Sequence, residues 1–185
     1  MTNDNIATLI GVIAVILVVI SYFVHNQTYY LLFQALNMGS LAISYLFSAE
    51  YFAMIGISVS MTRTITFFLI SKRGKEGPLW LSFAFAFLNV IAYYIVNFVI
   101  FESARPIDSL YVVALIAYSF IFRIKDMKKV RYLMIFPLSI SIIFNAFSNA
   151  TIFAVLSYVI ELVADIVAII RSSLNKDNKL RTKVE

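Results

Sequence analysis

The sequence predicts an all-α protein that spans a membrane with seven helices, and three observations lead to this prediction. Of the 185 residues, 62% are hydrophobic and only 14% are charged, and the mean hydropathy is +0.90. A soluble domain has roughly 45–50% apolar and about 25% charged residues. The apolar residues form stretches close to the ~20 residues that a spanning helix requires. The Lys and Arg residues gather mainly between these stretches.

The first apolar stretch, residues 6–24, is predicted to be a retained helix. The segment before it contains Asp4 and no Lys or Arg, and no small-residue cleavage pattern follows. A signal peptide has a basic start and a shorter apolar core. Six further spans are predicted at residues 28–48, 51–71, 78–101, 107–122, 131–148 and 151–171.

Short polar segments separate the predicted spans, and the fifth span is the shortest of the seven. Asp108 and Arg123 bracket only fourteen residues of it. Such a helix can cross the bilayer if its flanking Arg snorkels and the lipid thins locally. The alternative is a re-entrant segment.

The placement of Lys and Arg predicts the orientation in the membrane. With seven spans, the basic segments at 72–75, 123–131 and 171–183 fall on one side, whereas Arg105 lies in a loop on the other side. Basic loops remain cytoplasmic, so the N-terminus is expected outside and the C-terminus in the cytoplasm. The same placement accounts for the net charge of +5 without nucleic-acid binding, which would need exposed basic and aromatic positions.

Spans one to three can be laid on spans five to seven by adding 100 to the residue number, without a gap. Ser48 then falls on Ser148 and Phe47 on Phe147. Parallel repeats of this kind occur in transporters. The expected organisation is a single membrane domain with a first three-helix repeat at 6–73, a linker helix at 78–101, a second repeat at 107–172 and a basic cytoplasmic tail at 173–185.

Several short stretches resemble the bacterial Imp-YgjV inner-membrane protein family. They are residues 10–14 (Ile-Gly-Val-Ile-Ala), Gln34, residues 58–64 with Arg63 among them, and residues 169–171 (Ile-Ile-Arg). In its three-plus-one-plus-three pattern the chain also looks like the SWEET and PQ-loop group of small transporters. No Pro precedes Gln34, so the Pro-Gln pair of PQ-loop proteins is absent and no amino-acid or sugar substrate is inferred. The resemblance implies a multi-pass protein of the bacterial cytoplasmic membrane.

Three ionisable residues, Arg63, Glu161 and Asp165, lie well inside predicted spans. Such residues are costly in lipid and need partners or water. Glu161 and Asp165 are four residues apart and share a helix face. In the repeat Arg63 corresponds to position 163, between the two acids, so all three are expected to form a cluster that lines a central cavity. The cluster would be either a structural ion pair or a proton-coupled or substrate-binding site.

Two asparagines and a proline complete the candidate central site. Asn37 and Asn145 lie within spans and would act either as hydrogen-bonding contacts between helices or as part of the cavity. Pro137, at the repeat position of Asn37, is expected to kink the sixth span. The kink would mark a gate or be merely tolerated.

The sequence favours a small-solute transporter, and the alternative is a non-transporting accessory or structural membrane protein. An open, polar centre would favour transport, and a centre filled by side chains would count against it. No enzyme is expected, because no nucleophile–base constellation can be named. The chain has no Cys and a single histidine, His25, so no catalytic residue, cofactor or metal site is expected. The expected partners are the lipid bilayer, a small solute and a second copy of the chain, although no GxxxG dimer motif is present.

Overall fold

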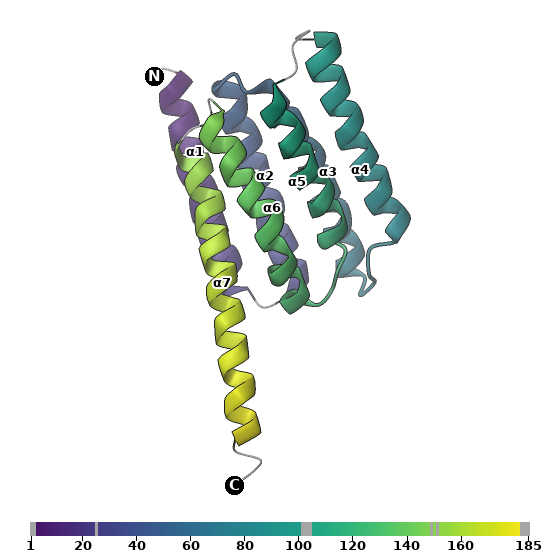
Figure 1. Ribbon diagram of the computed structural model, residues 1–185, viewed down its shortest axis with the longest axis vertical. Coiled ribbons are helices and arrows are strands. Elements are labelled where there is room, and N and C mark those ends of the chain that lie inside the picture. The colour runs from purple at the N-terminus through teal and green to yellow at the C-terminus, as the bar shows by residue number, and fades with distance from the viewer. Residues whose placement is uncertain (1–2, 25, 101–104, 149, 151, 182–185) are drawn as a thin grey trace.

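The computed structural model describes residues 3–24, 26–100, 105–148, 150 and 152–181, with the side chains of 3–4 and 172–181 left out. His25 lies outside the described residues. Over these ranges the chain forms seven α-helices and one π-helical segment and no strand (Figure 1). The elements are α1 (Asn3–Phe23), α2 (Gln27–Phe47), α3 (Tyr51–Lys72), α4 (Leu79–Tyr94), η1 (Ile95–Ile100), α5 (Pro106–Ile121), α6 (Met127–Phe147) and α7 (Ile152–Arg181).

Six of the described helices are long and apolar enough to cross a membrane: α1, α2, α3, α4 together with η1, α6 and α7. The predicted all-helical fold is therefore confirmed. The fifth helix, Pro106–Ile121, is shorter at 16 residues, which is about 24 Å at 1.5 Å per residue. It is one continuous helix beside α4 and α6 (Figure 1).

Three predicted boundaries differ from the structure. The fourth span changes from an α-helix to a π-helix at Ile95. The sixth helix begins at Met127 and not at 131, because the Asp126 side chain accepts a hydrogen bond from Lys128 N (3.0 Å) and caps the helix there. The last helix continues to Arg181, into the segment predicted as a tail.

The helices form a ring, and their order in it decides which side chains meet at the centre. α1, α2 and α3 pack in succession, as do α5, α6 and α7, and α1 packs against α7 (Figure 1). α4 packs against α3 and α5 on the outside of this ring. Consecutive helices run in opposite directions, so the segments 73–78 and 122–126 lie at one end and Arg105 at the other.

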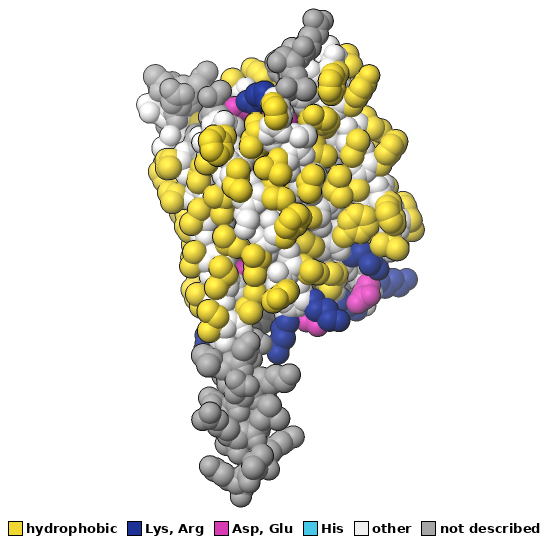
Figure 2. All heavy atoms as spheres, in the orientation of Figure 1, with side chains coloured by type: hydrophobic (Ala, Val, Ile, Leu, Met, Phe, Trp, Pro, Cys, Tyr) yellow, Lys and Arg dark blue, Asp and Glu magenta, His cyan; other side chains and the backbone are white. Residues whose placement is uncertain are grey.

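The surface of the bundle suits a lipid environment. Large apolar side chains are exposed along its length, and Lys and Arg gather at the end from which α7 emerges (Figure 2). The exposed basic residues at this end include Lys72, Arg73, Lys75, Lys125, Lys128, Lys129 and Arg171. Conversely, ionisable and amide side chains are buried inside the bundle, which is where intramembrane polar residues are expected to mark a site.

Candidate central site

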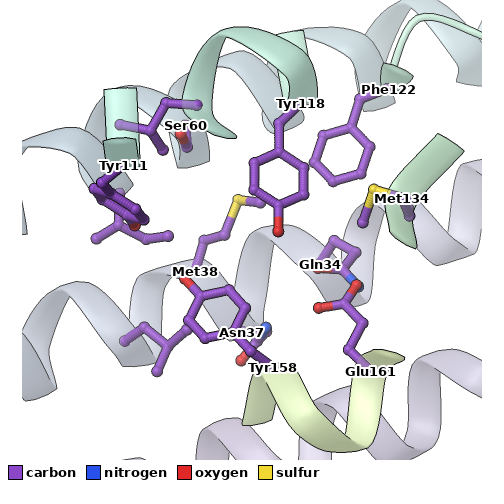
Figure 3. A pocket seen from close by; sticks show the side chains of 13 residues that line it. Gln34, Asn37, Met38, Ser60, Tyr111, Tyr118, Phe122, Met134, Tyr158 and Glu161 are labelled. Atoms are coloured by element: carbon purple, nitrogen blue, oxygen red, sulfur yellow. The ribbon is translucent and has the colours of Figure 1, made fainter. Parts of the chain in front are cut away.

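A small cavity lies at the centre of the ring, between α2, α3, α5, α6 and α7 (Figure 3). Its volume is about 10 Å³, which is roughly the space that one water molecule needs. In this conformation side chains fill most of the centre, which counts against transport. The lining residues include Gln34, Asn37, Ser60, Tyr118, Phe122 and Glu161.

Glu161 supplies a buried carboxyl group to this cavity from α7. Its Oε1 accepts a hydrogen bond of 2.6 Å from Gln34 Nε2 and a longer one of 3.4 Å from Tyr30 Oη, both on α2. Figure 3 shows the Glu161 and Gln34 head groups meeting below the ring of Phe122. The Tyr22 hydroxyl of α1 donates to the Glu161 backbone carbonyl (2.7 Å). Contacts from two other helices therefore hold Glu161 in place.

Asp165 lies one helical turn beyond Glu161 and is fully buried. The Nε of Arg131, on α6, lies 3.9 Å from its Oδ1, too far for a hydrogen bond. Neither oxygen of this carboxyl group has a hydrogen-bond partner among the described residues. Asp165 and Arg131 are thus a loose ion pair between α6 and α7.

Arg63 does not join these acids, and the predicted cluster is wrong in this respect. Arg63 is fully buried, and its Nη1 donates to the Leu115 backbone carbonyl (3.1 Å) and to Ser119 Oγ (3.0 Å) on α5. Its Cζ lies 5.1 Å from the ring centre of Phe122 and 6.0 Å from that of Tyr118. Within the described ranges, no Asp or Glu lies within ion-pair distance of it.

A shift of one residue in the repeat explains the wrong expectation. α2 and α6 begin 100 residues apart, at Gln27 and Met127, whereas the buried residues of α7 correspond to those of α3 at an offset of 101. One residue rotates a helix face by about 100°. Val163, at the position assigned to Arg63, is accordingly 54% exposed.

With an offset of 101, the buried faces of α3 and α7 correspond. Ile57 then matches Tyr158, Ser60 matches Glu161, and Thr64 matches Asp165, and all six residues are buried. The acids of α7 thus take positions that α3 fills with hydroxyl groups. Arg63 points to α5 instead.

The remaining predicted site residues form contacts between helices. Tyr45 Oη donates to Asn145 Oδ1 (2.5 Å), and Asn145 Nδ2 donates to the Ser141 carbonyl (2.7 Å). Ser157 Oγ lies 3.5 Å from Asn37 Oδ1, and Asn37 also lines the cavity. Pro137 is buried inside α6, and the helix continues through it.

A charged cluster at the other end of the bundle from the basic loops was missed by the sequence analysis. Arg105 Nε and Nη2 donate to the two carboxylate oxygens of Asp108 (3.2 and 3.0 Å), and its Nη1 and Nη2 donate to Glu50 (3.3 and 2.9 Å). We call Arg105, Glu50 and Asp108 the rim cluster. The hydrogen bond to Glu50 raises the pKa of Arg105 above its usual value. The Arg105–Asp108 spacing is visible in the sequence, but the partner Glu50 lies 55 positions away and no local pattern indicates it.

The central arrangement can hold and release a proton or bind a polar solute, because carboxyl, amide and hydroxyl groups converge on one buried space. Within the described residues, no group of three or more His, Cys, Asp and Glu side chains could hold a metal ion.

Comparison with known proteins identifies a family. The family model described as Imp-YgjV, bacterial inner membrane protein, matches residues 5–176. No curated protein and no solved structure matches the chain.

Proposed function

The chain belongs to the Imp-YgjV family of bacterial inner membrane proteins, and from that premise we propose that it is a small-solute transporter. The observation that carries the proposal is the buried contact of Glu161 with Gln34 and Tyr30 beside a central cavity. Ionisable side chains are rare in membrane-spanning segments and usually line a solute, ion or proton pathway. The proposal includes no enzymatic step.

We propose further that the bundle consists of two parallel three-helix repeats joined by α4. Tyr45 and Asn145 are 100 residues apart and are hydrogen-bonded to each other. Two equivalent residues that touch must lie close to the axis relating them, which supports a pseudo-twofold axis through the centre. Three pairs of equivalent residues line the cavity: Gln34 and Met134, Ile57 and Tyr158, and Ser60 and Glu161. A grouping with the SWEET and PQ-loop transporters, which have the same organisation, is proposed on this basis.

The filled centre is compatible with transport if the two halves move relative to each other. Alternating access in repeat transporters is a rocking of one bundle against the other around a fixed site. A conformation closed at the centre is then one state of the cycle. Glu161 lies at the contact between α7 and α2, one from each proposed repeat, and would therefore sense such a movement.

The test is a metabolite comparison in cells that lack the protein. Intracellular and medium solutes are profiled in the deletion strain and after complementation with the wild type, Glu161→Gln or Val163→Ala. Val163 is on the same helix but 54% exposed, so its variant controls for expression and insertion. We expect a solute difference that the wild type and Val163→Ala reverse and Glu161→Gln does not. Full restoration by Glu161→Gln at equal membrane abundance would contradict the proposed role of the site.

The second candidate function is that of a non-transporting accessory protein, and the filled centre favours it. In that case Glu161 and its partners would only hold α2 and α7 together. The deletion would then alter no solute, and Glu161→Gln would lower the amount of folded protein in the membrane.

The proposed orientation, with the basic end in the cytoplasm, can be tested directly because the chain has no cysteine. Lys75→Cys and Pro106→Cys place single thiols at exposed positions at opposite ends. A membrane-impermeant maleimide should label Pro106→Cys in intact spheroplasts and Lys75→Cys only after permeabilisation. The reverse labelling would invert the orientation.

A further inference from the structure

We propose that the Nε–Nη2 edge of Arg63 binds the carboxylate of a small organic anion. The ligand would bind in the central region of the bundle. Arg63 lies on the α3 side of the cavity and Glu161 on the α7 side. A role in transport rests on the function proposed above, whereas binding itself does not.

The guanidinium of Arg63 is anchored on one side and available on the other. Nη1 donates to the Leu115 carbonyl and to Ser119 Oγ, which holds the head group against α5. Nε and Nη2 are buried and have no acceptor among the described residues. These two nitrogens form one edge of the guanidinium, with parallel N–H bonds that match the spacing of two carboxylate oxygens.

The same chain shows how this edge binds a carboxylate. In the rim cluster, Arg105 Nε and Nη2 donate to Asp108 Oδ2 and Oδ1 at 3.2 and 3.0 Å. Arg63 presents the equivalent pair of donors inside the bundle, where no Asp or Glu of the described ranges lies within ion-pair distance. A carboxylate from outside the chain would satisfy both donors in that geometry.

The charge of Arg63 also calls for an anion. A buried guanidinium without a counter-charge is unfavourable in a low-dielectric interior. The rings of Phe122 and Tyr118 stabilise the guanidinium through cation–π contacts. They do not accept hydrogen bonds from Nε or Nη2. A single negative charge would neutralise the site.

The Arg63 site borders the central cavity. Leu115, Tyr118 and Phe122 contact the Arg63 head group and also line the cavity. Ser60 precedes Arg63 by nearly one helical turn on the same face, lines the cavity, and its buried hydroxyl has no partner in the described part of the chain. Rotation of the stacked Tyr118 and Phe122 rings (Figure 3) would join Arg63 to the cavity.

The surroundings favour a singly charged carboxylate over a phosphate. Arg63 supplies one positive charge and one two-donor edge, and the cavity carries the carboxyl group of Glu161 on its other side. A doubly charged phosphate would meet too little positive charge and a second acid.

The experiment uses the purified full-length protein in detergent micelles and minimal carboxylates as probes. The melting temperature is measured in sodium formate, acetate and propionate and, at equal ionic strength, in sodium chloride and phosphate, with acetamide as the neutral analogue of acetate. Binding to the folded state raises the melting temperature. We expect at least one carboxylate to raise it by several degrees more than chloride, phosphate or acetamide does.

The matched variants are Arg63→Lys and Arg131→Lys, which keep the charge and remove the two-donor edge. Arg63→Lys should weaken carboxylate binding at least tenfold, and Arg131→Lys should leave it unchanged. Carboxylates no more stabilising than chloride, or full binding by Arg63→Lys, would overturn the proposal. If Arg63→Lys does not fold, Arg63→Met takes its place, and retained carboxylate binding by that variant would equally overturn the proposal.

The outcome is separable from that of the transport test. If the purified protein binds carboxylates but the deletion strain shows no solute difference, the result would support the site and oppose transport. A restored flux of an uncharged solute without carboxylate binding would oppose the site and support transport.

Discussion

Arg105 and Arg63 both contact α5, but one is fully paired and the other is not. Arg105 lies in the rim cluster, 40% exposed, with both edges of its guanidinium on carboxylates. Arg63 lies inside the bundle, fully buried, with one nitrogen on α5 and two without acceptors among the described residues. A residue kept for stability should resemble Arg105, because buried charges are stable only when paired. The unpaired edge of Arg63 is the difference on which the proposed carboxylate site rests.

The largest effect is expected from Arg105→Met. The substitution removes the cation from beside Glu50 and Asp108, whose side chains are 3% and 2% exposed. Breaking a fully buried pair costs roughly 3–5 kcal/mol. Because Arg105 is 40% exposed and solvent screens part of the interaction, we expect a loss of about 2 kcal/mol in the free energy of unfolding. Unfolding of the purified protein by a denaturing detergent, followed by circular dichroism, measures it.

Two further variants act as controls for the rim cluster. Arg105→Lys keeps the charge and loses the paired hydrogen bonds, so it should recover about half of the loss. The triple variant with Glu50→Gln and Asp108→Asn removes the uncompensated charges and should be more stable than Arg105→Met alone. If Arg105→Met unfolds like the wild type, the rim cluster contributes nothing and the contrast with Arg63 disappears.

A smaller effect is expected from Gly56→Ala, which acts on the anchor of Arg63. A Cβ on Gly56 would lie 2.8 Å from Leu115 Cδ1, closer than van der Waals contact allows. The Leu115 side chain can move, so the loss of stability should be near the low end for overpacking, about 1 kcal/mol. Displacement of α5 at Leu115 should also weaken binding of formate or acetate, measured by the shift in melting temperature.

Gly39→Ala is the matched control for this substitution, because its added Cβ would meet only Met61 Sδ, at 3.2 Å, and Met side chains adapt readily. It should change stability less than Gly56→Ala and leave carboxylate binding intact. Equal effects of the two variants would show that the approach of α3 to α5 does not position Arg63.

The fold was predictable from the sequence because bilayer thickness sets helix length and polar turns interrupt the apolar runs. The depth of Arg63, Glu161 and Asp165 followed from the same reasoning, and all three are buried. Their partners did not follow. The buried face of α7 corresponds to that of α3 at an offset of 101 residues and not 100, and an ungapped comparison of apolar helices does not reveal a shift of one. The partner of Glu161, Gln34, lies 127 positions away, and only the packed ring brings the two together.

The smallest effect on stability, and the sharpest separation of the two arginines, is expected from Arg63→Met. The variant removes an unpaired buried charge and keeps most of the side-chain volume, a change that is often neutral or stabilising. Ser119 Oγ still donates to the Leu115 carbonyl (2.9 Å), so the α5 groups that bound Nη1 remain satisfied. We expect the free energy of unfolding to stay within about 1 kcal/mol of the wild-type value or to rise, while carboxylate binding is lost. A loss as large as that of Arg105→Met would mean that Arg63 is a structural residue. The two arginines would then differ in burial but would both stabilise the fold.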